Sequence, residues 1–315
     1  MTLKANTADG DGTAAEWATR KERGSLALLK TMAFLSLRLG RRPSRIILYV
    51  IAAYFFVFGP KARRHSRHYL QLALRRRPKA RDRFLQILSF ATTIHDRVYL
   101  MNGRDELFNV TQEGESKVLA RIAGGGGALL LGAHMGSFEV IRSASRHERG
   151  VRVAMAMYEE NARKIGAILG AINPAYVPDI ISLGHIDAML NIAEHLKHGG
   201  CVGVLGDRTL GSEPVQAVTI LGETAYLPTG PMRAAAILRC PVFFMVGLYR
   251  GRNNYHVAFE AIADFSAGAG RGRETAVREA IERYAEMLDR HCRSDPYNWF
   301  NFFDFWRRSS ENRGT

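Results

Sequence analysis

Short, continuously apolar runs alternate with segments of helical periodicity from residue 128 to residue 292, and this alternation constrains the fold more than any other feature. Such runs have the length of buried strands. A strand that is apolar on both faces must be covered on both sides. The pattern therefore predicts an α/β fold, a mixed sheet flanked by helices. The expected strands are 128–133, 151–157, 176–182, 201–205, 215–221, 242–249 and 255–261, and the expected helices are 82–100, 138–146, 162–171, 186–197, 231–238 and 274–292.

Positive charge is concentrated in the first quarter of the chain. Residues 1–83 contain 19 Lys or Arg and 5 Asp or Glu, whereas the remaining residues contain 25 of each. The whole net charge of +14 therefore lies in this N-terminal region. Clustered cations of this kind can bind nucleic-acid phosphates, anionic lipid headgroups or an acidic carrier protein.

An unbroken apolar run of 13 residues, 46–58, lies inside the basic region with cations on both sides. As a helix it would be about 20 Å long, shorter than the roughly 30 Å hydrocarbon core of a bilayer. An amphipathic segment from Leu26 to Leu37 precedes it, with a break at 40–43. We expect residues 1–83 to form a helical region that dips into a membrane, and residues 84–315 to form the α/β domain. The alternative is that these helices are ordinary core elements packed on that domain.

His134 and Glu139 are the strongest catalytic candidates, in the run Gly-Ala-His-Met-Gly-Ser-Phe-Glu behind the first expected strand. In a regular helix, side chains five residues apart point about 140° from each other, so the two groups converge only if the backbone changes direction. Gly136 permits unusual backbone angles, and Ser137 can cap a helix that starts at Phe138. A histidine held by a carboxylate can act as a general base. The alternative is a structural histidine bonded to a backbone carbonyl.

This motif and three later blocks resemble the glycerolipid and lysophospholipid acyltransferase superfamily, and within it the bacterial lipid A lauroyl/myristoyl acyltransferase family. The second block is Gly206-Asp207-Arg208, directly after the apolar run 201–205. The third, 221–231, resembles the segment that lines the substrate side in that family. The fourth, the aromatic tail 299–306, is similar to the closing stretch of a predicted-acyltransferase subgroup. The resemblance covers roughly residues 124–306.

The resemblance implies a membrane-associated O-acyltransferase that moves a fatty-acyl group from acyl-carrier protein or coenzyme A to a hydroxyl of a lipid or glycolipid. In this interpretation His134 deprotonates the hydroxyl, and Glu139 fixes the imidazole tautomer. Backbone N–H groups near Gly136 and Ser137 would hold the oxyanion. The implied location is the cytoplasmic face of a bacterial inner membrane, with peripheral or shallow insertion.

Three further polar residues are expected to contact substrate. Arg208 would bind a phosphate or carboxylate of the acceptor, and Asp207 would orient it or contact a hydroxyl. The alternative is that Asp207 and Arg208 form one surface ion pair. Asn161 loosely matches another polar position of the family. His95-Asp96-Arg97 is interpreted instead as part of a helix packed beneath the site, because consecutive helical residues point in different directions.

Other functions remain open at this stage. Water could replace the alcohol, which would make the protein a thioester or lipid hydrolase, or the chain could be a non-enzymatic basic membrane-binding or nucleic-acid-binding protein. We favour no nucleic-acid partner, because a long apolar run lies among the cations, and we expect no cofactor. We expect no metal, because the histidines show no metal-ligand spacing. The widely spaced Cys201, Cys240 and Cys292 are expected to be buried thiols, and the polar start, 1–22, does not resemble an export signal.

Overall fold

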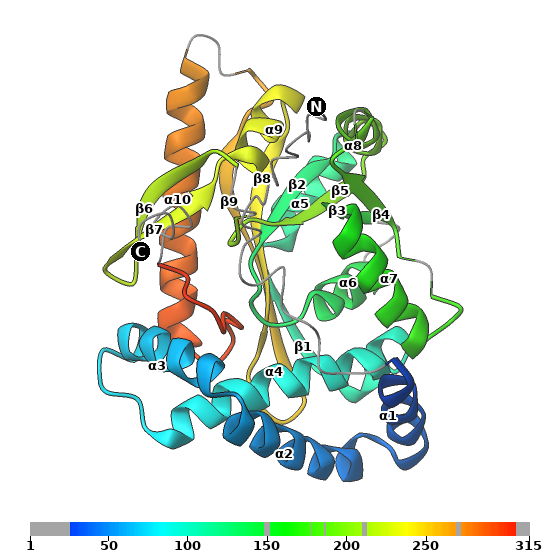
Figure 1. The fold of residues 1–315 in the computed structure, drawn as a ribbon. Coiled ribbons are helices and arrows are strands. Elements are labelled where there is room, and N and C mark those ends of the chain that lie inside the picture. Colours follow the sequence, from blue (N-terminus) through cyan, green and yellow to red (C-terminus); the bar gives the residue numbers. More distant parts are fainter. Residues whose placement is uncertain are drawn as a thin grey trace, which may run out of the picture.

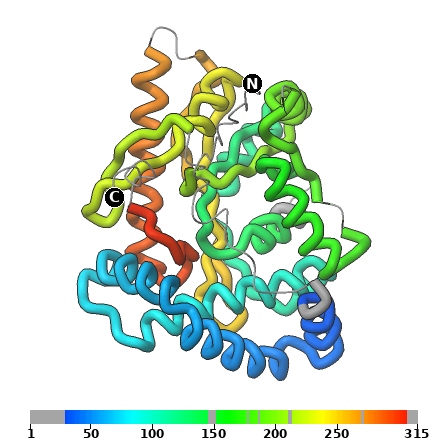
Figure 2. Tube along the Cα trace, in the orientation of Figure 1, coloured from blue at the N-terminus to red at the C-terminus, as the bar shows by residue number. Residues whose placement is uncertain are grey.

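The computed structural model describes residues 26–147, 152–176, 178–185, 187–209, 213–268 and 272–306. Figure 2 follows the chain from the N-terminal helices at the base of the molecule, through the sheet, to the C-terminal segment beside them. The predicted polar leader, 1–22, lies outside the described residues.

A seven-stranded sheet forms the centre of the molecule, with the order β1-β9-β8-β2-β5-β3-β4 (Figure 1). β2 is parallel to both β5 and β8, whereas β8 and β9 are antiparallel, so the sheet is mixed as predicted. Its strands are β1 (Asn109–Glu113), β2 (Ala128–Gly132), β3 (Val153–Tyr158), β4 (Ile180–Leu183), β5 (Cys201–Leu205), β8 (Pro241–Tyr249) and β9 (Asn254–Asp264).

Helices cover both faces of this sheet, as the apolar runs require. Leu129 and Leu131 of β2 contribute to one buried cluster, and Leu130 contributes to the other. All five residues of β2 are buried, so the predicted fold class is confirmed. One face carries α4 (Ala80–Met101), α5 (Glu115–Ala123) and α6 (Phe138–His147); the other carries α3 (Pro60–Leu74), α8 (Ala188–Lys197), α9 (Gly230–Leu238) and α10 (Arg273–Ser294).

Five elements were not predicted individually from the sequence: α3, the 3-10 helix Asp105–Leu107, β1, α5 and the strand Glu223–Pro228. β1 is an edge strand whose side chains are mostly exposed, so it has no apolar run that would reveal it. α5 is short and follows β1 directly. β7 (Glu223–Pro228) pairs with β6 (Val215–Ile220) in a separate antiparallel hairpin, where the sequence indicated only a substrate-side segment. α7 (Glu159–Ile172) and the three buried, free cysteines agree with expectation.

The N-terminal region is helical, as expected. α1 (Leu26–Leu39) and α2 (Arg41–Phe58) are separated at Gly40, whose φ of 85° interrupts the helix. No described helix is by itself long and apolar enough to cross a bilayer; α2 and α3 reach that length and composition only as a pair bent by 95°. The expected boundary between residues 83 and 84 lies within α4.

α2 has one packed face and one exposed apolar face. Ser44, Leu48 and Ala52 are buried, and the helix packs against α4. The opposite face leaves large side chains accessible to solvent. The exposed residues are Ile46 (69%), Ile47 (38%), Tyr49 (51%), Val50 (67%), Tyr54 (50%), Phe55 (43%), Val57 (55%) and Phe58 (58%). Core packing therefore accounts for only one side of this apolar run.

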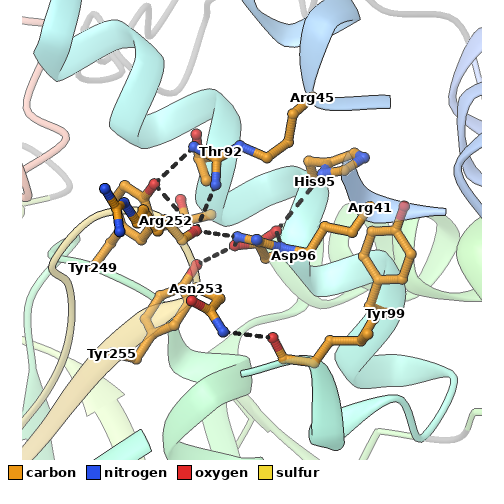
Figure 3. Close-up of polar contacts among 12 residues, drawn as sticks. Arg41, Arg45, Thr92, His95, Asp96, Tyr99, Tyr249, Arg252, Asn253 and Tyr255 are labelled. Carbon is orange, nitrogen blue, oxygen red and sulfur yellow. Dashed lines mark hydrogen bonds and ion pairs between the residues drawn. The ribbon is translucent and has the colours of Figure 1, made fainter. Parts of the chain in front are cut away.

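A buried polar network anchors α2 to the rest of the molecule (Figure 3). Arg41 donates two hydrogen bonds of 2.7 Å to the carboxylate of Asp96 in α4. Tyr255 of β9 donates a third, at 2.8 Å, and the His95 ring lies beside the same group. Burial would raise the pKa of Asp96, but His95, Arg41 and Tyr255 hold it below its ordinary value. His95 also contacts Ser44 of α2, so this cluster is structural, as expected.

Replacing Asp96 with Ala should destabilise the fold strongly. The substitution leaves Arg41, whose side chain is 9% exposed, without its carboxylate partner. We expect the free energy of unfolding to fall by about 3–5 kcal/mol, measured by denaturant titration in detergent. Glu160→Ala is the control, because its pair with Lys164 is exposed and should contribute less than about 1 kcal/mol. Equal losses in both variants would contradict the anchoring role.

Candidate active site

The pairing of β2 with β5 brings the first two site residues together. The two strands are parallel, and their register aligns Gly132 with Leu205. His134 and Asp207 each lie two residues beyond this last aligned pair, at the carboxyl edge of the sheet. Ligands commonly bind at this edge in open α/β sheets. The predicted position of His134 at the mouth of a buried strand is therefore correct.

The side chains of His134 and Asp207 are in direct contact. His134 Nδ1 lies 2.8 Å from Asp207 Oδ1, and the backbone N–H of His134 donates to Asp207 Oδ2 at 3.0 Å. The indole N–H of Trp299 donates to the same oxygen at 2.9 Å. The Asp207 side chain is fully buried, whereas 31% of the His134 side chain is exposed. Asp207 thus holds the Nδ1 edge of the ring, while the rest of the ring remains accessible.

The charges around this pair favour a neutral imidazole beside an ionised carboxylate. Burial lowers the pKa of His134, Asp207 opposes that shift, and Arg208 adds to it, so the pKa lies below its ordinary value. Burial would raise the pKa of Asp207, but His134, Arg208 and Trp299 hold it well below its ordinary value. A carboxylate can only accept, so Nδ1 carries the proton and Nε2 has the free lone pair. This is the tautomer that a general base requires.

Glu139 does not brace His134, which corrects the sequence-based prediction. Its carboxylate lies 2.7 Å from Nε of Arg97 in α4 and is mostly buried. Glu139 stands in the first turn of α6, and that turn packs against α4. The partner of His134 comes instead from the next strand of the sheet. The prediction was wrong because it searched for the partner nearby in the sequence, whereas strand register supplies it.

Gly136 and Ser137 shape the turn after His134. Gly136 has a φ of 67°, and a Cβ there would lie 2.0 Å from the carbonyl oxygen of Gly247. The Ser137 hydroxyl accepts a hydrogen bond from the N–H of Val140, which confirms its predicted role as the cap of α6. The N–H of Gly136 donates to Asn298 O, and that of Ser137 donates to Gly247 O. Both of these N–H groups are thus engaged within the protein.

The aromatic tail holds the histidine loop in place. The N–H of Phe300 donates to His134 O at 2.8 Å, and Met135 pairs with Trp299 in an isolated antiparallel bridge. Trp299 is completely buried and packs edge-to-face against Tyr69. Packing in the core is therefore only part of what the tail does in the fold. Sequence reasoning missed that the tail supplies the donor to Asp207, because a tryptophan N–H has no sequence signature.

Arg208 and Asn161 lie at the same edge of the sheet. Arg208 Nη2 donates to Phe300 O at 3.3 Å, and its guanidinium lies 5.1 Å from the centre of the Phe303 ring. Asp207 is fully buried and bonded to His134 and Trp299, so it does not form the surface ion pair that was the alternative interpretation. Asn161 lies in the first turn of α7, after β3, two strands away from β2.

Replacing Trp299 with Phe tests the donor to Asp207. The variant keeps an aromatic ring but removes a hydrogen bond to a buried carboxylate, which should cost roughly 1.5–3 kcal/mol of folding free energy. Trp306→Phe is the control, because its N–H donates at 3.2 Å to a neutral carbonyl, Ile220 O. We expect thermal unfolding to show a clearly larger loss for Trp299→Phe. A larger loss for Trp306→Phe would contradict the assigned hydrogen bond.

Comparison with known proteins gives one family for almost the whole described chain. The model of the bacterial lipid A biosynthesis acyltransferase family matches residues 28–308, which include the N-terminal helices, the sheet and the aromatic tail. No individual curated protein matches the chain. Since the family match covers far more than half of the sequence, the chain belongs to the bacterial lipid A biosynthesis acyltransferase family.

Proposed function

We propose that the protein transfers a fatty-acyl group from a thioester donor to a hydroxyl of a lipid or glycolipid acceptor at a membrane surface. The observation that carries this proposal is the contact between His134 and the buried carboxylate of Asp207. Family membership supplies the reaction class, acyl transfer to lipid A-like acceptors. The donor, the mechanism and the membrane association belong to the proposal.

His134 Nε2 removes the proton from the acceptor hydroxyl. The hydroxyl oxygen then forms a bond to the thioester carbon, the carbon–sulfur bond breaks, and the proton passes from His134 to the departing thiolate. Asp207 keeps the ring in the correct tautomer and stabilises the imidazolium while it exists. Ser137 is no nucleophile in this scheme, because its hydroxyl caps α6.

Arg208 supplies positive charge beside the reacting atoms. Its guanidinium is close enough to His134 to lower the pKa of the imidazole. A fixed cation at this place favours negative charge on the substrate, either on a tetrahedral oxyanion or on an acceptor phosphate. This replaces the oxyanion contacts expected from the N–H groups of Gly136 and Ser137.

Asp207→Asn should abolish most acyl transfer. An Asn amide at this position donates to Nδ1 and favours the wrong tautomer, so kcat should fall roughly 10²–10⁴-fold. The carboxylate also raises the pKa of His134, so its loss should move the acid limb of kcat/KM to lower pH. The measurement is acylated lipid formed from lauroyl thioester and a hydroxylated lipid acceptor. Release of free fatty acid instead of acylated lipid would favour the hydrolase alternative.

Glu139→Gln is the matched control for the carboxylate that holds the base. Its ion pair with Arg97 weakens, but the His134–Asp207 contact stays intact. We expect a smaller loss of kcat and an unchanged acid limb. If Glu139→Gln shifts the acid limb and Asp207→Asn does not, Glu139 is the partner of the base and the present assignment fails.

The exposed apolar face of α2 supports membrane association. Ile46 and Val50 are 69% and 67% exposed, and Arg42 is also exposed near the start of the helix. Insertion of large side chains below the headgroups, with cations above them, is typical of helices that lie in the interface. In this proposal α2 lies along the membrane surface.

Ile46→Asp combined with Val50→Asp should weaken vesicle binding. Burial of each side chain contributes about 1.5–3 kcal/mol, so the partition constant should fall by roughly 100-fold or more. The assay is cosedimentation with vesicles that contain phosphatidylglycerol. Leu190→Asp combined with Ile237→Asp is the control, because these residues are 71% and 60% exposed on other helices. Equal binding by both double variants would contradict insertion through α2.

A further inference from the structure

The surface of α3 and the loop that follows it is strongly basic and differs in character from the exposed face of α2. Residues 60–83 contain ten Lys or Arg and a single acidic residue, Asp82. No large apolar side chain between Phe58 and Phe90 is exposed, so this stretch contributes none. The bend of 95° between α2 and α3 turns this surface away from the direction of α2.

Six exposed cations lie along this stretch, and we call the surface that they form the basic face. Arg64 and Arg67 lie on α3, about 60° apart at 100° per residue, so they share one side of that helix. Arg75, Arg77 and Lys79 lie in the loop after α3, and Arg81 lies in the first turn of α4. The basic face comprises Arg64, Arg67, Arg75, Arg77, Lys79 and Arg81, and none of these six forms an ion pair with any residue that the structure describes.

The loop is held in a defined conformation by its one acid. Asp82 accepts two hydrogen bonds from Arg76, one from the backbone N–H of Lys79 and one from the hydroxyl of Tyr297. The carboxylate therefore faces inward and neutralises a cation outside the basic face. Because the backbone of the loop is held in place, binding a partner costs less conformational entropy than it would on a flexible loop.

The basic face lies next to the C-terminal segment, which is hydrogen-bonded to the loop that contains His134. Tyr297, which bonds to Asp82, precedes the residues that bond to Gly136 and His134. Farther along α4, Gln86 donates to Trp299 O, and Phe90 packs against Phe300. From Arg81 to Phe90 the helix rises about 14 Å. Figure 1 shows α3 beside the C-terminal segment.

We propose that the basic face is the docking surface for an acidic carrier protein that presents the acyl chain as a thioester. This inference rests on the proposed acyl-transfer function. Helices that lie in a membrane interface combine apolar anchors with cations, as α2 does, whereas the basic face exposes no large apolar side chain. An acidic protein requires only complementary charge, which steers association and fixes orientation. A flexible thioester arm would then reach from the basic face towards His134.

The test is the triple charge reversal Arg75→Glu/Arg77→Glu/Arg81→Glu in the full-length protein. The probe is a bacterial acyl carrier protein that carries a lauroyl thioester, and lauroyl-pantetheine is the donor without a protein. We expect KM for the carrier-bound donor to rise on the order of tenfold at low salt, with kcat unchanged. Transfer from lauroyl-pantetheine and cosedimentation with phosphatidylglycerol vesicles should both stay at the wild-type level.

The control is Lys117→Glu/Arg163→Glu/Lys197→Glu, which changes net charge equally at exposed cations of α5, α7 and α8. An unchanged KM for the carrier-bound donor in the basic-face variant, or an equal rise in the control, overturns the proposal. Loss of vesicle binding with carrier affinity retained assigns the surface to the membrane instead. The corresponding triple Gln variant replaces the Glu variant if the latter unfolds.

Failure of the acyl-transfer function is distinguishable from failure of docking. If the wild-type protein transfers from neither donor, the proposed function is wrong, and fluorescence anisotropy of the labelled carrier protein still tests the basic face. Carrier binding that weakens in the basic-face variant but not in the control supports docking. Binding that is absent in the wild type overturns it.

Discussion

The buried carboxylate of Asp207 is the group on which the rest of the site depends. An ionised carboxylate without solvent is costly unless donors surround it. Three donors meet that requirement here: the backbone N–H and the ring of His134, and the indole N–H of Trp299. The carboxylate lies at the end of β5, and its donors come from the end of β2 and from the C-terminal tail. Satisfying one charge therefore fixes three distant segments relative to one another.

α4 connects this site to the N-terminal helices. Asp96 faces α2 and β9, where it accepts hydrogen bonds from Arg41 and Tyr255, while the next residue, Arg97, pairs with Glu139 of α6. Consecutive residues of a helix point in different directions, which lets one helix hold two neighbours. Glu139 thus positions α6, the helix that directly follows the loop containing His134. Its role is to place that loop, whereas Asp207 holds the imidazole ring.

Periodicity and residue chemistry predicted most of the architecture, because buried strands and amphipathic helices impose patterns that are local in the sequence. β2, β5 and α6 were found with nearly correct bounds, and the capping role of Ser137 followed from its residue type. β1 was not predicted, because an exposed edge strand needs no apolar pattern. The partner of His134 was not predicted, because periodicity contains no information on which strands become neighbours.

The sequence by itself determined the fold class, the concentration of positive charge in the first quarter, and the position of His134 at the end of a buried strand. Each of these follows from local composition and spacing. Only the tertiary structure decided that Asp207, 73 residues away, rather than Glu139, holds the imidazole. The physical reason is that strand register and burial act across the sheet. They bring together groups that are remote in the chain. They also engage the N–H groups of Gly136 and Ser137, which would otherwise have been free.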